Sequence, residues 1–390
     1  MKVLILFNNK AREFNYLNLI KKNLVKKGLQ AEIINGSDSK LFFTTLFNFK
    51  PNVILTFPIT GSEHPYKLHF AKLFFKSKII CLRTEGAMDE SSSANIIEHV
   101  GIAKYSKFLV DLELFWGKKQ RGILGAVLES QGKITSVEKC KVVGYPRIEF
   151  DLKLHKKNNK NYIGIFTNFQ DADFRSKSDL ISAKDISNSV FDTMLEIANK
   201  SFQFRSMFIN SLSRTAKQNP SLNFILKTHP AENIKTYDEL NIYSNIKILD
   251  GSENLGLIFS DLCVIYHFGS TVLLDSFVYK IPSVQIYSDL LKNINSYGWQ
   301  STKTITLDEF DETIKNPPKF QDNLYVKSIL EKEINYFSKD SYLPVNNITD
   351  IIVDNNYVSS KISVFNFYSL KTLFALTYFS FRFFKTKIFK

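Results

Sequence analysis

The chain has 390 residues, which exceeds one typical domain and predicts two. A hydrophobic content of 44% and a charged content of 23% are ordinary for a globular protein. The net charge of +13 is compatible with a nucleic acid, an anionic membrane or an anionic substrate as partner, so the position of the basic residues has to distinguish these classes.

The three cysteines, Cys81, Cys140 and Cys263, lie in or beside apolar, strand-like runs. An odd number of scattered, buried thiols argues against disulfides and for a reducing cytosol. No spacing of cysteine and histidine suggests a zinc site. The first apolar run, residues 2–7, is too short for a signal peptide, so we expect a cytoplasmic protein.

Short apolar runs that alternate with helical patterns predict an α/β domain with a doubly wound parallel sheet over residues 1–150. The predicted strands are 2–7, 31–34, 52–56, 78–82, 107–110 and 141–143. The predicted helices are 14–27, 41–47 and 64–75. No G-x-G-x-x-G follows the first strand, so this domain lacks the dinucleotide fingerprint.

A polar, basic stretch at about 145–161 is interpreted as a linker, after which the alternation restarts in a second domain, residues 151–340. The predicted strands of this domain are 162–166, 224–226, 246–249, 261–266 and 283–286. Its predicted helices are 189–219, 237–240, 255–260, 272–279, 307–314 and 324–337. We therefore expect two Rossmann-like halves that face a cleft.

The most informative stretch is residues 224–232, where an apolar run ends in a basic and hydroxylic tip and is stopped by Pro230. This pattern predicts a buried parallel strand, and open α/β sheets bind ligands at the carboxyl ends of their strands. His229 is therefore expected in a binding cleft. The alternative is that Lys227 and His229 are merely solvated residues at the end of a strand.

A second strand, residues 261–266, leads through Gly269, Ser270 and Thr271 into a predicted helix at 272–279. Glycine permits a tight turn, and either hydroxyl residue can cap the helix. A helix start that offers free N–H groups, hydroxyls and a positive dipole end suits a phosphate. The two strand ends together predict a site for a phosphate or diphosphate.

Further candidate residues follow strands of the first domain. Arg83, Glu85 and Gly86 follow the strand at 78–82, and a carboxylate in a desolvated cleft can act as a general base. The alternative is that Glu85 forms an ion pair with Arg83 or caps a helix. His64 either contacts substrate or begins a helix, and the helix is the favoured interpretation.

One Asp-x-Asp triplet, Asp171-Ala172-Asp173, follows the strand at 162–166. Carboxylate oxygens suit magnesium or manganese, so the triplet could hold a divalent cation. A solvated polar loop is the favoured interpretation, and we expect no metal site.

The C-terminal part, residues 341–390, is assigned to a crossover segment and a tail. Residues 361–390 contain six Lys or Arg and no acidic residue, interleaved with phenylalanines. Their uncharged runs are shorter than the roughly 20 apolar residues that span a bilayer. We interpret the tail as an amphipathic segment on an anionic membrane surface, with a helix packed back on the protein as the alternative. The basic residues lack nucleic-acid-binding motifs, so we expect no nucleic acid partner.

A series of short landmarks lies between residues 80 and 286. In chain order they are Trp116-Gly117, Gly144-Tyr145-Pro146-Arg147, Thr167-Asn168-Phe169, His229-Pro230-Ala231-Glu232 and Gly269-Ser270-Thr271. This series resembles that of the bacterial surface carbohydrate biosynthesis protein family of GT-B glycosyltransferases. These enzymes are similar to the CMP-sugar-dependent polysialyl- and Kdo-type transferases.

The resemblance implies an inverting, metal-independent glycosyltransferase of capsule, O-antigen or a related glycan, without a cofactor. Glu85 would be the base and His229 would contact the donor phosphate. Thr84 stands where the CMP-sugar enzymes carry a further acid, which leaves Glu85 as the only candidate base. The other implied donor-binding residues are Lys227, Thr228, Pro230, Glu232, Gly269, Ser270, Thr271, Thr167 and Asn168. The residues expected at the acceptor or in the cleft are Arg83, Gly86, His64 and Arg147.

The implied partners are a nucleotide sugar, with a CMP-sugar favoured, a lipid-linked or oligosaccharide acceptor, and the inner face of the cell membrane. Three alternatives stay open. They are a polyol-phosphate transferase resembling CDP-glycerol enzymes, a nucleotide-sugar 2-epimerase, which would need no membrane tail, and a catalytically silent scaffold.

Overall fold

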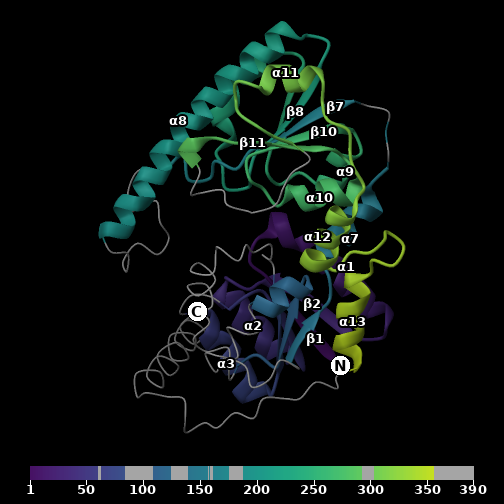
Figure 1. The fold of residues 1–390 in the computed structure, drawn as a ribbon. Coiled ribbons are helices and arrows are strands. Elements are labelled where there is room, and N and C mark those ends of the chain that lie inside the picture. Colours follow the sequence, from purple (N-terminus) through teal and green to yellow (C-terminus); the bar gives the residue numbers. More distant parts are fainter. Residues whose placement is uncertain are drawn as a thin grey trace. The chain divides into compact units, whose positions relative to one another are not determined.

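The computed structural model describes residues 1–59, 63–83, 109–123, 139–156, 158, 161–174, 188–291 and 303–354. The chain divides into two compact units (Figure 1). The first unit combines Met1–Phe150 with the chain from Glu331 onward, and the second is Asp151–Leu330. Each unit contains one six-stranded sheet whose neighbouring strands all pair in parallel.

The sheet of the first unit has the strand order β2-β1-β3-β4-β5-β6. Its strands are β1 (Lys2–Phe7), β2 (Gln30–Asn35), β3 (Val53–Thr56), β4 (Lys78–Leu82), β5 (Leu112–Phe115) and β6 (Cys140–Val142). The helices within this unit are α1 (Lys10–Lys26), α2 (Ser39–Phe49), α3 (Glu63–Phe75) and α13 (Pro344–Asp354). Helix α7 (Pro146–Leu154) begins in this unit and ends in the second.

Both faces of this sheet are buried, which is why its strands are nearly continuous apolar runs. Val3 and Ile5 of β1 pack in one cluster with residues of α1 and α13. Leu4 and Leu6, on the opposite face, pack in another cluster with residues of α2 and α3. The alternation of side chains along β1 thus assigns one pair of helices to each face.

The strand expected at 107–110 was placed wrongly, because the strand is β5, at Leu112–Phe115. The acidic residue Glu113 interrupts the apolar pattern of β5. Its side chain is nevertheless buried, because it pairs with Arg83 on the neighbouring strand end. A buried ion pair of this kind cannot be recognised from periodicity.

The second sheet has the order β12-β11-β10-β7-β8-β9. Its strands are β7 (Tyr162–Phe166), β8 (Asn223–Lys227), β9 (Ile246–Leu249), β10 (Leu262–His267), β11 (Ser283–Ile286) and β12 (Lys303–Ile305). The helices are α8 (Asn188–Gln218), η5 (Ile234–Ile242), α9 (Leu255–Phe259), α10 (Val272–Tyr279), η6 (Asp289–Leu291), α11 (Phe310–Lys315) and α12 (Leu324–Ile334), the last ending in the first unit. The short strand β12 was not expected from the sequence.

The strand order reverses between β7 and β10, since β8 and β9 extend the sheet on one side of β7 and β10 to β12 on the other. Helix α8 covers one face, where Phe204, Phe208 and Leu212 join the core cluster of Ile163 and Ile165. Residues of α9 and α10 pack on the other face. In such sheets ligands bind outside the carboxyl ends of the strands at the reversal point.

The return of the chain to the first unit depends on two glycines of the sequence landmarks. A Cβ at Gly117 would lie 2.2 Å from the carbonyl oxygen of Lys332, near the end of α12. Gly144 has φ +93° and faces Pro344 at the start of α13. The Val345 N–H donates to Glu149 Oε2 (2.7 Å). The landmarks Trp116-Gly117 and Gly144-Tyr145 therefore form the surface on which residues 331–354 dock.

No helix among the described residues is long and apolar enough to cross a membrane. The proposed membrane tail, residues 361–390, lies outside the described residues.

Candidate functional site

The reversal point of the second sheet brings two of the sequence landmarks together. Asn168 follows β7, and Gly269 follows the adjacent strand β10. The Asn168 side-chain amide donates to the Gly269 carbonyl oxygen (3.4 Å). Residues about a hundred positions apart in the chain thus meet where the topology locates a binding site.

The turn from β10 into α10 has the geometry expected for a phosphate-binding helix start. Gly269 adopts φ +64°, a conformation that favours glycine, as its position predicts. The Ser270 hydroxyl accepts from the Val272 N–H (3.3 Å), so Ser270 provides the side-chain cap. Thr271 is the N-cap residue by position, but its side chain makes no capping hydrogen bond. Its hydroxyl is therefore not used to hold the helix end.

His267 supports this turn from the buried end of β10. Burial lowers the pKa of His267 to about 4, so the ring is neutral at pH 7. Its Nδ1 accepts from the Ser270 N–H (3.3 Å). A neutral imidazole with an acceptor at Nδ1 fixes the direction of the loop that leads into α10.

The end of β8 carries the His229 loop. Lys227 is buried, and its Nζ donates to the Gly251 carbonyl oxygen (2.6 Å). The Ala231 N–H donates to His229 Nδ1 (3.2 Å). Because Nδ1 is an acceptor, the ring proton lies on Nε2, which is a hydrogen-bond donor. His229 can therefore donate to an anionic oxygen.

Glu232 is the anchor that holds the ends of β7 and β8 together. Its carboxylate accepts from the Thr167 hydroxyl (2.9 and 3.0 Å), the Phe169 N–H (2.8 Å) and the His229 N–H (3.3 Å), and also from the Tyr237 hydroxyl. Burial raises the pKa of Glu232, against the hydrogen bonds that favour the ionised form. Thr167 and Glu232, both expected to contact the donor, thus bond to each other and fix Asn168 and His229.

Gly251, after β9, is a site-supporting residue that the sequence analysis missed. A Cβ there would lie 2.4 Å from Pro230 Cα and 2.5 Å from Pro230 N. The backbone at Gly251 therefore supports the His229-Pro230 turn and accepts the bond from Lys227. A glycine directly after a predicted strand was the available signal, but nothing in the sequence pairs it with Pro230.

One aspartate of the Asp-x-Asp triplet, Asp173, has a structural role as the partner of a buried arginine. Asp173 accepts two bonds from the guanidinium of Arg205 (2.9 and 2.5 Å), and Arg205 is buried in the long helix α8. Asp171 is exposed. Among the described residues, no group of three or more His, Cys, Asp or Glu could hold a metal ion.

In the first unit, Arg83 follows β4 and forms a buried ion pair with Glu113 of β5 (3.1 and 3.0 Å). The Arg83 carbonyl oxygen accepts from Trp116 Nε1 (2.6 Å). Burial raises the pKa of Glu113, against the attraction of Arg83. Glu85 and Gly86 lie outside the described residues, so the expected role of Glu85 as a base stays a prediction.

Two sequence landmarks of the first unit join at the carboxyl ends of β5 and β6. The Tyr145 ring stacks on Trp116, with centroids 3.6 Å apart and planes at 17°. Arg147 Nε donates to the Tyr145 hydroxyl (2.9 Å), and its guanidinium lies 4.8 Å from the ring centroid. Arg147 is therefore held by Tyr145, whose ring stacks on Trp116, and Trp116 in turn bonds to the Arg83 carbonyl.

His64 lies in the first turn of α3, as the favoured helix interpretation predicts. Its Nε2 lies 2.9 Å from the Thr56 hydroxyl, and its ring stacks on Phe57 (4.4 Å, 9°). Burial, followed by the charge of Lys67, lowers the pKa of His64 to about 3. These contacts make His64 a neutral packing residue at the end of β3.

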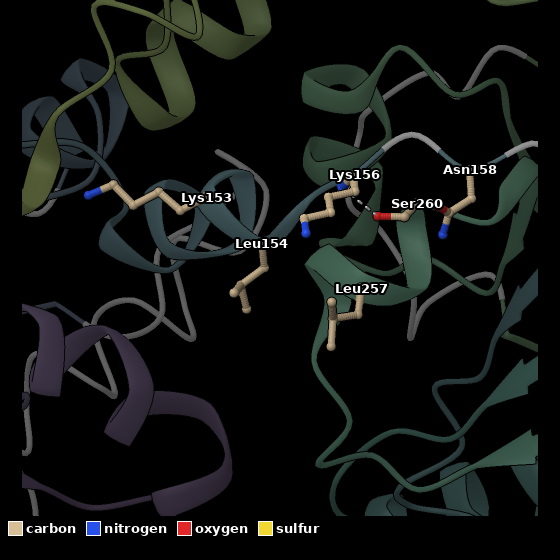
Figure 2. A pocket seen from close by; sticks show the side chains of 6 residues that line it. All are labelled: Lys153, Leu154, Lys156, Asn158, Leu257 and Ser260. Carbon is tan, nitrogen blue, oxygen red and sulfur yellow. Dashed lines mark hydrogen bonds between the residues drawn. The ribbon is translucent and has the colours of Figure 1, made fainter.

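A hollow of about 310 Å³ lies in the second unit near the basic linker stretch (Figure 2). The Asn158 N–H donates to the Ser260 carbonyl oxygen (2.9 Å), just before the amino ends of β7 and β10. The hollow is therefore at the sheet edge opposite the His229 site and takes no part in it. Its lining residues are Lys153, Leu154, Lys156, Asn158, Leu257 and Ser260.

No family model and no curated protein sequence matches the chain. Solved structures do match. The S. aureus MnaA–UDP structure has a TM-score of 0.55 at 13% identity, covering 94% of this chain and 100% of its own. The UDP-GlcNAc 2-epimerase from Neisseria meningitidis bound to UDP-GlcNAc has a TM-score of 0.53 at 13% identity, covering 91% and 100%. The wall teichoic acid polymerase TagF has a TM-score of 0.54 at 14% identity, covering 91% and 89%.

At these identities the similarity concerns the fold. It extends over almost the whole chain and includes both units, each with its parallel six-stranded sheet. The expected fold class is confirmed: the chain has the two-domain α/β fold known as GT-B.

Proposed function

We propose that this protein is a GT-B enzyme of bacterial surface glycan biosynthesis that transfers a sugar from a nucleotide donor. The observation that carries the proposal is the reversal point of the second sheet, where Asn168 bonds to the Gly269 turn at the start of α10. The His229 loop follows β8, which is the other neighbour of β7. The donor phosphates would bind to these groups.

The proposed chemistry follows from what these groups can donate. His229 Nε2, the hydroxyls of Ser270 and Thr271 and the positive end of α10 would stabilise the negative charge that develops on the departing nucleotide. The charge of Lys227 adds to this field from the end of β8. These groups would perform the task that a divalent cation performs in other transferases, so the proposed reaction is metal-independent. Glu85 would take the proton of the acceptor hydroxyl, with inversion at the sugar.

The structural neighbours support a nucleotide-sugar substrate and a surface glycan. Two of the neighbours are complexes with UDP and with UDP-GlcNAc, and a third is a wall teichoic acid polymerase. The sequence landmarks favour a CMP-sugar, and we retain that donor as the proposal. The proposed acceptor is a lipid-linked or oligosaccharide chain at the inner membrane face, where the tail at 361–390 would hold the enzyme.

A polyol-phosphate transferase is the second candidate, because the fold similarity to TagF is as close as that to the epimerases. The same phosphate-binding groups would serve a CDP-linked polyol. A 2-epimerase would use the nucleotide sugar without any acceptor. Incubating the chain with a nucleotide sugar alone distinguishes an epimerase from the two kinds of transferase, because only an epimerase converts the nucleotide sugar without an acceptor.

Nucleotide binding tests the proposal directly. Thermal shift with CMP, CDP, UDP and GDP should show stabilisation by one nucleotide in the wild type and its loss in His229→Ala. The matched control is His155→Ala, a partly buried histidine near the opposite edge of the same sheet. Stabilisation by UDP or GDP in place of CMP would discard the CMP-sugar donor. Binding by none of the four would favour the scaffold, and unchanged binding in His229→Ala would refute the phosphate role of His229.

A further inference from the structure

The amino edge of the first sheet gathers basic residues at or just before the starts of three neighbouring strands. Strands β1, β3 and β4 are adjacent, with Val3 opposite Val53 and Val53 opposite Lys78. The Asn52 N–H donates to the Lys2 carbonyl oxygen, and the Lys78 N–H donates to the Asn52 carbonyl oxygen. The chain segments that enter these strands therefore lie side by side.

The same edge carries phenylalanines from the ends of α2 and α3, which pack beside each other in the first unit (Figure 1). Phe47 meets Phe75 edge to face at 5.5 Å, and Phe74 lies 4.4 Å from Phe70. The Phe74 side chain is 68% exposed. Helices that run antiparallel to the strands end at the amino edge of the sheet, so these rings lie near the lysines.

Three chain segments at this edge carry charge of one sign. The segments 1–2, 47–53 and 73–79 contain four lysines and no acidic residue. Lys2 Nζ lies 5.5 Å from the Phe49 ring centroid. Lys50 and Lys76, which follow α2 and α3, both have positive φ (49° and 54°), where glycine or asparagine is the usual residue. Both are exposed.

We propose that this aromatic–lysine edge, formed by Phe47, Phe49, Phe74, Phe75, Lys2, Lys50, Lys76 and Lys78, docks on an anionic lipid bilayer. Aromatic rings insert at the depth of the lipid headgroups, and lysines beside them bind anionic headgroups. An acidic protein partner would satisfy the lysines but would leave no role for the exposed Phe74 ring. The proposal depends neither on the C-terminal tail nor on nucleotide binding, so it can fail or hold independently of the proposed function.

A tryptophan probe at Phe74 tests contact with lipid directly in the full chain. The emission of Phe74→Trp should shift to the blue with vesicles that contain phosphatidylglycerol, and lipids with brominated tails should quench it. The matched control is Leu257→Trp, at a residue of the second unit that is 56% exposed. Its emission should not change. The signal of the unsubstituted chain, which contains two tryptophans, is the background.

Charge removal tests the role of the lysines. Vesicle sedimentation of Lys50→Gln/Lys76→Gln should show binding lowered about 25-fold, because each lysine near an anionic surface contributes about a factor of five. The control pair is Lys235→Gln/Lys247→Gln, exposed lysines of the second unit, with a change of less than about twofold. Sedimentation of the chain with vesicles without quenching at position 74 would overturn the proposal. Equal binding of the chain to neutral and to anionic vesicles would also overturn it. The same holds if the chain binds no vesicles and instead self-associates, with the self-association lost in Phe74→Ser.

Discussion

Replacing Glu232 tests whether one carboxylate positions the candidate site. Glu232→Ala removes the acceptor of the Phe169 N–H and of the Tyr237 hydroxyl, both on buried residues. A buried donor without a partner costs about 1–3 kcal/mol, so the two together should lower the free energy of unfolding by about 3 kcal/mol. The Thr167 hydroxyl can rotate toward another acceptor, and water can reach the partly exposed His229, so their contribution is small.

Glu232→Gln is the informative partner of this variant. Its carbonyl oxygen can still accept from the Phe169 N–H, and its amide group can donate to the Tyr237 hydroxyl oxygen. The charge of the acceptor is lost, and the Tyr237 hydroxyl proton loses its acceptor, whereas the bond from the Phe169 N–H is kept. We therefore expect a cost below that of Glu232→Ala, about 1–2 kcal/mol. Nucleotide binding should follow the same order, because alanine releases Asn168 and His229 whereas glutamine keeps them in place.

Urea unfolding followed by circular dichroism, together with nucleotide titration, measures both effects. The control is Glu239→Ala, an exposed carboxylate on the 3-10 helix η5 that also carries Tyr237, which should leave stability and binding nearly unchanged. Equal stability of Glu232→Ala and wild type would refute the anchoring role. An equal loss in Glu232→Gln and Glu232→Ala would show that charge, and not the hydrogen-bond geometry, is what the loop requires.

Three further predictions concern the support of the site. Gly251→Ala should lower the free energy of unfolding by about 2 kcal/mol or more, because the added Cβ collides with Pro230. The control is Gly122→Ala, which places a Cβ in open space and should be neutral or stabilising. Equal unfolding midpoints of the two variants would contradict this prediction. Unfolding free energy should fall as the pH drops from about 6.5 to about 4, because the unfolded chain binds a proton that native His267 does not. That contribution is fully present above pH 6.5, and His267→Asn should make the profile shallower in denaturant titrations, with buried His64 contributing the remainder. Asp173→Asn should cost about 2 kcal/mol by leaving the buried Arg205 guanidinium without its carboxylate. Stabilisation of the wild type by added magnesium or manganese that is lost in Asp173→Asn would instead favour a metal role for the triplet.

Local patterns in the sequence determined much of the fold. Apolar runs that alternate with helical patterns gave most of the strands of both sheets and the long helix α8, because burial on both faces makes parallel strands uniformly apolar. The turn at Gly269 could also be predicted, since its positive φ is a property that glycine alone adopts readily. His229 was located correctly after β8 because polar residues that follow a buried run mark the end of a strand.

Only the tertiary structure decided which of these ends meet. The pairing of β7 with β10 brings Asn168 to Gly269, and local periodicity does not encode the order of strands in a sheet. Glu232 was expected to bind a ligand, but its hydrogen bonds go to groups that only folding assembles, among them Thr167 from another strand end. Glu113 interrupts the apolar pattern of β5 and is buried because Arg83 pairs with it. A sequence states which side chains prefer burial, whereas the partner that makes the burial of a charge tolerable comes from a distant segment and is fixed only when the chain packs.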